Sequence, residues 1–319
     1  MKALAYRRFG APEVLRWEAD WPVPELRPKT VLVDVHAGGI NPKDALLRKG
    51  HFNRTLARAP LPRASGLEIA GTVGAVGPGV TDVAVGDAVF GMTNRFIGGV
   101  HAQQACLAID EIAPRPDGLT FVQAAAVPLA AQTALQALRD CAQLRAGQRV
   151  LINGATGGVG HFAVQIAKAM DAEVHAVCSG RNAGFAAMLG ADAVYDYNAT
   201  PAAAIDASFD VVFDVFGRDE RTAYRRALGR TGVYVSTVPK GATLRGELMA
   251  ALRIDRRSRL VRVHSNAADL GQLAGWIEDA RLYPHIDTAY PITRAVAAHR
   301  HIESKHATGK IVLDMTVAE

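Results

Sequence analysis

The sequence has little cysteine. Only three occur in 319 residues, at Cys106, Cys141 and Cys178. Three scattered thiols cannot form a disulfide framework, and they cannot supply the four ligands of a structural zinc site. We therefore predict that each cysteine is a small buried apolar residue.

The sequence also lacks a long apolar run and a targeting segment. Hydrophobic residues make up 49% of the chain and charged residues 21%, and no apolar run of about 18 residues, the length needed to cross a bilayer, is evident. The start, MKALAYRR, alternates like a strand and has no apolar signal core after its charges. We expect a cytoplasmic protein that does not bind membranes.

The net charge is only weakly biased. It is +5 at pH 7 for the whole chain, which alone says little about a partner. Basic residues gather at 253–262, but this segment lacks the interleaved aromatic residues of a nucleic-acid site. A solvent-facing or subunit-edge strand is the favoured interpretation, so no nucleic-acid partner is expected.

The pattern of apolar residues changes near residue 118. Before it, alternating stretches and glycine-rich turns predict strands, as at 31–36 and 73–80. After it, a helix at 121–138 begins an alternation of strands and helices, which predicts an α/β fold with a parallel sheet. The predicted strands of this sheet are 149–153, 173–178, 193–195, 211–215, 233–237 and 259–263. Helices at 267–280 and 294–305 and strands near 286 and at 310–314 complete the prediction.

A glycine-rich turn follows the first strand of the predicted sheet. The segment INGATGGVGHFAVQIA covers residues 152–167 and leads from that strand into a helix. A dinucleotide fold needs glycine where the chain turns tightly, where backbone approaches the pyrophosphate and where the helix lies close to the strand. Ala155 replaces the first glycine of the usual fingerprint. The remaining amides and the helix N-terminus are predicted to bind a pyrophosphate.

The end of the second strand bears on the choice of cofactor. A carboxylate about twenty residues after the turn would bind the ribose hydroxyls of NAD. The sequence instead has CSGRN at 178–182, whose hydroxyl and guanidinium suit a 2′-phosphate. We therefore predict NADPH rather than NADH. The alternative is that Arg181 only begins a solvent-facing helix.

Several motifs together resemble one protein family over the whole chain. They include GINPKD at 39–44, GLEIAGTV at 66–73, AAAVP at 124–128, the glycine turn and HATGKIVL at 306–313. The sequence is similar to the zinc-independent, ζ-crystallin-like quinone oxidoreductases of the medium-chain dehydrogenase/reductase superfamily. The resemblance implies a GroES-like β-barrel catalytic domain at 1–118, a Rossmann NADPH-binding domain at 119–264 and a return to the barrel at 265–319. It also implies a homodimer in which strand 259–263 pairs across subunits.

The resemblance also indicates chemistry without a metal. Zinc-using relatives carry a cysteine after the Gly-Ile pair and a histidine in a Gly-His-Glu motif, where this sequence has Asn41 and Leu67. The cysteine-rich lobe that holds structural zinc in those relatives is also missing. Without a Lewis acid, the easier reaction is hydride transfer to an electron-poor acceptor, namely a quinone or an α,β-unsaturated carbonyl.

The resemblance implies a set of ligand contacts. Asn41 would line the junction of nicotinamide and substrate, although a turn residue before Pro42 is the simpler alternative, and Thr133 would contact the nicotinamide side. Lys310 is a weaker candidate, because lysine before a strand is commonly only solvated. The other implied contacts are Gly157, Gly158 and Val159 for the pyrophosphate, Ser179, Arg181, Asn182 and Tyr197 for the adenosine phosphate, and Phe216, Gly217, Thr237 and Val238 for the nicotinamide ribose.

The substrate side departs from the family pattern. Many relatives have a tyrosine after Arg-x-Gly near residue 50, where this sequence has His51 and then Phe52. His51 is a candidate proton donor because the pKa of imidazole lies near neutrality, and the alternative is an exposed loop histidine. Two other functions stay open. One is an enoyl-thioester reductase, and the other is an NADPH-binding sensor or RNA-binding protein with vestigial catalysis.

Overall fold

The structure is a computed structural model that describes residues 1–53, 60–217, 221–240, 244–246, 248–249, 252 and 257–317. The chain forms two compact units. Unit 1 consists of Met1–Leu129, His264–Glu278 and Pro284–Glu319, and unit 2 of Ala130–Val263 and Asp279–Tyr283. The sequence pattern changes at residue 118, whereas the units divide between Leu129 and Ala130.

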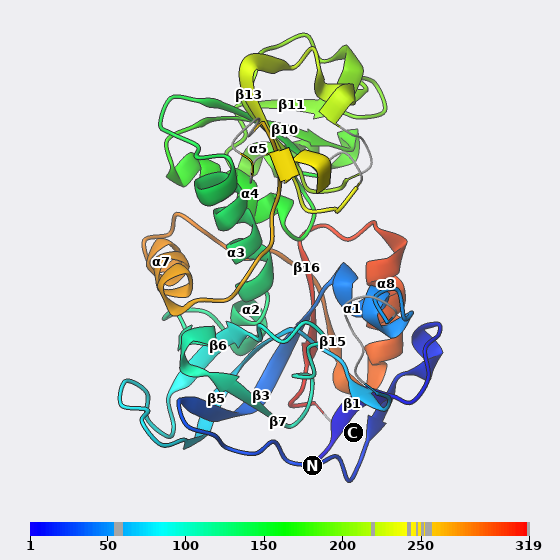
Figure 1. Cartoon of the computed structure of the whole chain (residues 1–319), viewed down its shortest axis with the longest axis vertical. Helices are drawn as coiled ribbons and strands as arrows, with labels where there is room; N and C mark the ends of the chain where they lie inside the picture. Colours follow the sequence, from blue (N-terminus) through cyan, green and yellow to red (C-terminus); the bar gives the residue numbers. More distant parts are fainter. Residues whose placement is uncertain are drawn as a thin grey trace. The chain divides into compact units, whose positions relative to one another are not determined.

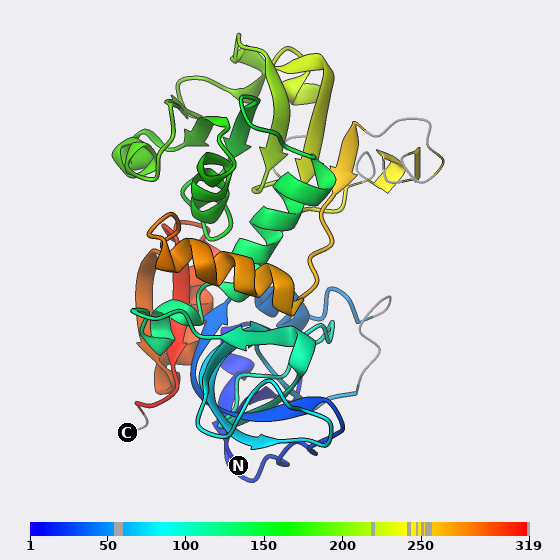
Figure 2. The same ribbon diagram turned by 90° about the vertical axis from the view of Figure 1, so that its left-hand side faces the viewer.

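Unit 1 is built mainly from antiparallel strands, which curve around a common interior in Figure 2. One sheet has the order β2-β1-β4, and the other has the order β15-β16-β3-β5-β6-β8, with β7 also paired to β3. The long β3 pairs through its first half with β7 and through its second half with β16. The strands are β1 (Ala3–Tyr6), β2 (Arg16–Glu18), β3 (Thr30–Ile40), β4 (Arg63–Ala64), β5 (Glu68–Val76), β6 (Ala88–Met92), β7 (Gln104–Ala108), β8 (Ile112–Pro114), β15 (Ile286–Pro291) and β16 (Lys310–Asp314).

Two helices of unit 1 support the end of β3. Helix α1 (Pro42–Arg48) begins where β3 ends, since Pro42 suits the first helical position and the Asp44 carboxylate accepts the backbone N–H of Asn41 at 2.8 Å. Helix α8 (Ala295–Ser304) packs on α1 and β16 (Figure 1). An ion pair between Arg48 and Glu303 joins α1 to α8. The unit also contains α2 (Phe121–Ala124) and α7 (Ala267–Glu278).

Unit 2 contains a six-stranded parallel sheet of order β11-β10-β9-β12-β13-β14. Numbered from β9 as the first strand, this is the 3-2-1-4-5-6 order of the dinucleotide-binding fold, which confirms the predicted α/β class. Helix α4 (Gly160–Ala169) packs on β9 and β10, and α5 (Ala183–Met188) follows β10. The strands are β9 (Arg149–Asn153), β10 (Glu173–Cys178), β11 (Ala193–Asp196), β12 (Phe209–Asp214), β13 (Leu228–Ser236) and β14 (Ser258–Leu260).

Two expectations from the sequence, on the helix at 121–138 and on the cysteines, are wrong in detail. The single helix predicted at 121–138 is divided into α2, α3 (Pro128–Gln136) and a π-helical turn at Ala137–Cys141, because a proline cannot continue the helix that precedes it. The stretch Phe121–Cys141 does reach a length and hydropathy compatible with a membrane span, but 78% of its most apolar window is buried inside the protein, as in a core helix.

Cys106 and Cys141 are only half-buried, and only Cys178 is buried as predicted.

Candidate functional site

A buried ion pair lies beside Asn41 in unit 1. The Lys310 ammonium donates to Oδ1 of Asn41 at 2.6 Å and to Oε1 of Glu68 at 2.7 Å. The Asn41 amide nitrogen Nδ2 donates to the same Glu68 oxygen at 2.8 Å. The exposed fractions are 2% for Lys310, 4% for Asn41 and 0% for Glu68. Lys310 is therefore not a solvated lysine, and we call these three residues the Lys310 cluster.

Strand register brings the Lys310 cluster together. Asn41 follows β3, Glu68 begins β5 and Lys310 begins β16. Gly39 of β3 pairs with Glu68, and Ile40 of β3 pairs with Ile311. The three side chains thus come from one place in the sheet, although they are far apart in the sequence.

A glycine next to the cluster makes room for the carboxylate. A Cβ atom on Gly39 would overlap Oε1 of Glu68 and would lie 2.6 Å from the carbonyl oxygen of Ala125. The second carboxylate oxygen of Glu68 accepts the backbone N–H of Leu129 at 2.7 Å, in the first turn of α3. A negative charge is favourable at a helix N-terminus. Glu68, which the sequence reasoning did not select, is therefore the centre of the local hydrogen-bonding pattern.

Titratable groups of α1 lie next to the Lys310 cluster. Burial raises the pKa of Asp44 to about 7, and the nearby Glu68 charge also raises it, while the Asn41 N–H, Lys310 and Lys43 act in the opposite direction. Burial lowers the pKa of Lys43, whose ammonium lies 4.2 Å from the centre of the Phe96 ring. The carboxyl of Asp44 therefore gains and loses its proton near neutral pH.

The predicted proton donor His51 lies in the turn after α1. Its side chain is exposed, and its backbone N–H donates to the carbonyl of Leu46 at 3.1 Å. The neighbouring Phe52 is half-buried and contacts Phe96 edge to face, with 5.3 Å between ring centres. His51 therefore has the exposed-loop environment that was its alternative interpretation, and its role as a donor stays a prediction.

The glycine turn of unit 2 has the geometry of a dinucleotide fingerprint. Gly154 directly follows β9 with φ +80°, and a Cβ atom on Gly160 would overlap the carbonyl oxygen of Gly154. Gly160 is thus the glycine that allows the helix to lie close to the strand. Gly157, Gly158 and Val159 are half-buried at the N-terminus of α4. These residues fit a pyrophosphate group, because backbone amides and the helix dipole meet there.

The residues predicted for the adenosine phosphate lie around the end of β10. Ser179, Arg181 and Asn182 follow it directly, and the backbone N–H of Tyr197 donates to the carbonyl of Cys178 at 3.1 Å. The Asn182 side chain donates to the hydroxyl of Thr156 in the glycine turn at 3.2 Å. Arg181 and Tyr197 are exposed.

An acid that the sequence reasoning missed also lies at the end of β10. Asp196 ends β11 and is the register partner of Cys178. A Cβ atom on Gly180 would lie 2.6 Å from Oδ2 of Asp196, between the predicted phosphate contacts Ser179 and Arg181. Counting residues after the glycine turn could not identify Asp196, because the pairing of β10 with β11 brings Asp196 next to Cys178. The available signal was an acid at the end of the neighbouring strand.

Four other predicted contacts lie at the ends of β12 and β13. The buried Asp214 carboxylate accepts the Asn153 amide at 2.9 Å and the Gly217 N–H at 2.8 Å. The hydroxyl of Thr237 donates to the Val215 carbonyl at 2.8 Å. Phe216, Gly217, Thr237 and Val238 therefore come from one end of the parallel sheet, where such folds bind ligands. Thr133 is buried within α3.

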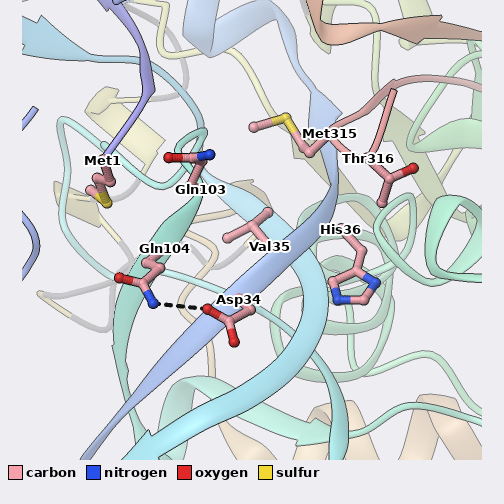
Figure 3. Close-up of a pocket in the computed structure, with 8 residues that line it drawn as sticks. All are labelled: Met1, Asp34, Val35, His36, Gln103, Gln104, Met315 and Thr316. Carbon is pink, nitrogen blue, oxygen red and sulfur yellow. Dashed lines mark hydrogen bonds between the residues drawn. The ribbon is translucent and has the colours of Figure 1, made fainter. Parts of the chain in front are cut away.

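A separate cavity in unit 1 contains none of the predicted site residues. It has a volume of about 460 Å³. In Figure 3 the side chain of Gln104 donates to Asp34, at a distance of 2.9 Å. The lining residues are Met1, Asp34, Val35, His36, Gln103, Gln104, Met315 and Thr316. Within the part of the chain that the structure describes, no group of three or more His, Cys, Asp or Glu side chains is placed to hold a metal ion.

Comparison with known proteins assigns the family. Residues 27–117 match the alcohol dehydrogenase GroES-like domain, and residues 189–313 match the family described as zinc-binding dehydrogenase. The quinone oxidoreductase of Sus scrofa is 31% identical, over 98% of this chain and 97% of that protein. The chain belongs to the quinone oxidoreductases of the medium-chain dehydrogenase/reductase superfamily.

Other members of this superfamily are similar over nearly the whole chain. The structure of the quinone oxidoreductase from Coxiella burnetii has 33% sequence identity and a TM-score of 0.90, with 99% of each chain covered. The chloroplastic NADPH-dependent alkenal/one oxidoreductase of Arabidopsis thaliana is 31% identical, over 98% of this chain and 79% of that protein. This protein is therefore an oxidoreductase of a family that depends on a pyridine nucleotide.

Proposed function

We propose that this protein transfers a hydride from NADPH to a quinone or an α,β-unsaturated carbonyl compound without a zinc ion. The observation that carries the proposal is the bond from the buried Lys310 ammonium to the amide oxygen of Asn41. Zinc-using relatives have a cysteine at the position of Asn41 and a histidine at that of Leu67. Here the local cation is an ammonium group of the chain, which cannot coordinate an alcohol oxygen as a Lewis acid does. An acceptor that is already electron-poor does not need one.

The residues of the chain would bind, orient and shield the reactants. When bound, NADPH supplies the hydride. Negative charge then develops on the acceptor oxygen, and hydrogen-bond donors near that oxygen lower the barrier. We assign this role to the region of Asn41 and Lys310, because an ammonium has three N–H bonds and Asn41 and Glu68 accept two of them. Asp44 holds a proton near neutral pH and joins His51 as a candidate source of the proton that completes the reduction.

Two observations bear in opposite directions on the choice of NADPH. Ser179 and Arg181 follow β10 and offer a hydroxyl and a guanidinium to a 2′-phosphate, and the Arabidopsis relative is named as NADPH-dependent. The carboxylate of Asp196 beside Gly180 would instead repel a phosphate. We propose NADPH, with a preference over NADH that Asp196 reduces.

The edge of the unit 2 sheet supports the proposed homodimer. Strand β14 is the last strand of the sheet order and pairs with β13 on one side. The edge strand of a sheet is a common place for pairing between two chains. Leu244, Leu248 and Leu252, four residues apart in the preceding segment, are about half exposed, at 49%, 59% and 58%. No disulfide bond joins any of the three cysteines, which supports the proposed cytoplasmic location.

The test is NADPH oxidation against a panel of acceptors. The panel contains 1,4-naphthoquinone, 9,10-phenanthrenequinone, a simple alkenal, crotonyl-CoA and a sample without acceptor, and NADPH consumption is followed by absorbance. We expect turnover with quinones or the alkenal, and the same rate after treatment with a metal chelator. Turnover of crotonyl-CoA alone would favour the enoyl-thioester reductase. Tight NADPH binding without any turnover would favour the sensor or RNA-binding protein.

A further inference from the structure

We propose that Glu68 is a positioning residue that fixes the carboxamide of Asn41 in a single orientation, in part by holding Lys310. This inference rests on the proposed function insofar as Asn41 contacts the reactants. Glu68 itself is fully buried, and its carboxylate accepts hydrogen bonds from Asn41, Leu129 and Lys310.

The two ends of the Asn41 amide face opposite charges. Its oxygen accepts from the Lys310 ammonium at 2.6 Å, and its nitrogen donates to the Glu68 carboxylate at 2.8 Å. A terminal amide has two orientations related by a half-turn, which exchange oxygen and nitrogen. In the reversed orientation the NH₂ group would face the ammonium and the oxygen would face the carboxylate. Both contacts would be repulsive, so the ion pair allows only the observed orientation.

Burial prevents water from replacing either partner. Lys310, Glu68 and Asn41 are at most 4% exposed, and a polar group left without a hydrogen-bond partner at such a site destabilises the fold. The Glu68 carboxylate is itself held in place by the Leu129 N–H and by the space above Gly39. The orientation of Asn41 is therefore determined by the backbone of β3 and α3 as well as by the two charges.

The consequence for a ligand is a fixed hydrogen-bonding pattern. With Glu68 and Lys310 in place, any group that contacts Asn41 meets the same arrangement of amide oxygen and nitrogen at every encounter. A randomly oriented amide would present the wrong atom for part of the time, and misplaced groups at a reacting centre lower turnover. The adenosine end of the cofactor would contact unit 2, so binding of NADPH is expected to depend little on Glu68.

The experiment uses the full chain and the variants Glu68→Gln, Lys310→Met, Lys310→Arg and Asn41→Leu. Glu13→Gln is the matched control, because Glu13 is half exposed and pairs with Arg300, which is also exposed. Thermal unfolding and circular dichroism first identify the variants that fold. We expect Glu68→Gln and Lys310→Met each to lower kcat by about 10-fold or more, with the Kd of NADPH unchanged within about threefold. Lys310→Arg should recover part of the loss, since it restores a cation and donor.

The decisive comparison combines Glu68→Gln with Asn41→Leu. If Glu68 acts through the amide, the double variant has the same kcat as Asn41→Leu alone. A general structural role would instead lower kcat by the same factor in both backgrounds, and that result would overturn the proposal. The proposal would also be overturned if Glu68→Gln folds and has the same kcat as Glu13→Gln.

A second readout does not depend on turnover. In a nitrogen-15 spectrum, the side-chain NH₂ signal of Asn41 is identified by its loss in Asn41→Leu. We expect two well-separated hydrogens that exchange slowly with water in the wild type, and a narrower separation with faster exchange in Glu68→Gln and Lys310→Met. An unchanged Asn41 signal in these variants would contradict the inference even if the proposed function holds. If the wild type turns over no acceptor, the proposed function fails, and this spectrum alone decides the orientation.

Discussion

The hydroxyl of Tyr234 donates to the carboxylate of Asp214 at 2.8 Å. The other oxygen of Asp214 accepts from Asn153 and from the backbone of Gly217, so this carboxylate ties together the ends of β9, β12 and β13. Tyr234→Phe removes the hydroxyl donor to a buried charge and is expected to lower the free energy of unfolding by about 1–3 kcal/mol. It should also weaken NADPH binding, because the Val215–Gly217 segment loses support. Denaturant titration and calorimetry test this, with Tyr290→Phe in unit 1 as the control. Equal cofactor affinity in both variants would show that the contact does not organise this segment.

Gly160→Ala is expected to prevent cofactor binding. The added Cβ would overlap the backbone of Gly154, and backbone cannot move aside as a flexible side chain can. Gly184→Ala, in α5, provides the control, because a Cβ there meets no atom within 4 Å. That substitution should leave binding unchanged and stabilise the helix by up to about 1 kcal/mol. Cofactor titration by fluorescence measures both, and normal affinity in Gly160→Ala would contradict the assigned role of the turn.

Two substitutions at the end of β10 should change cofactor selectivity in opposite directions. Arg181→Ala should weaken NADPH binding by roughly 10- to 100-fold, the value of a charge-assisted hydrogen bond, with little effect on NADH. Asp196→Asn should strengthen NADPH relative to NADH, because it removes a negative charge beside Gly180. Calorimetric titration of each variant with both cofactors gives the ratios. Equal losses for both cofactors in Arg181→Ala would mean that this side chain does not contact the phosphate.

Asp44 should make the protein less stable as the pH rises from about 4 to about 7. Burial raises its pKa in the folded state from 3.8 to about 7, so the folded protein retains a proton that the unfolded chain loses near pH 4. The contribution of Asp44 to stability is therefore complete below about pH 4 and falls by up to about 4 kcal/mol as the pH rises to about 7. Asp44→Asn keeps an acceptor for the Asn41 N–H without the titration. Urea unfolding at a series of pH values should show a smaller decline for this variant between pH 5 and 8, and parallel curves would refute the assignment.

His299 should make the protein less stable as the pH falls. Burial lowers its pKa from 6.5 to about 3, and the positive charge of Arg48 contributes. The folded protein thus keeps a neutral imidazole where the unfolded chain takes up a proton, and this stability is lost as the pH falls from about 6.5 toward 3. Neither ring nitrogen has a hydrogen-bond partner among the described residues. His299→Leu should therefore lose less stability than the wild type between pH 7 and 4. If His299→Leu loses as much stability as the wild type over this pH range, other groups cause the acid destabilisation.

Much of the parallel sheet could be predicted from the sequence. The bounds of β9, β10 and β16 agree with the predicted strands, because buried parallel strands read as continuous apolar runs. Strand β14 is shorter than predicted and begins at Ser258. An arginine-rich segment has no apolar pattern from which the ends of a strand can be predicted. Residues 253–256, at the start of the basic segment 253–262, lie outside the described residues.

The candidate site was less predictable, because its residues meet through strand pairing. Lys310 looked like a solvated lysine because both of its partners, Asn41 and Glu68, lie at the other end of the sequence. The one signal for Glu68 was an isolated acid in the apolar stretch GLEIAG. Asp196 was missed for the same reason, since its neighbour Gly180 follows the adjacent strand β10.

The pairing of β3 with β16 also has a consequence for the time course of synthesis. Ile40 lies opposite Ile311, so the seven-stranded sheet of unit 1 stays incomplete until the ribosome has made β16. Strands β9 to β14 of unit 2 leave the ribosome earlier and in consecutive order, and we expect that unit to fold first. Until β16 arrives, the nascent protein holds the carboxylate of Glu68 without its lysine. The lysine of the Lys310 cluster is therefore made only after all the other described strands of the two units.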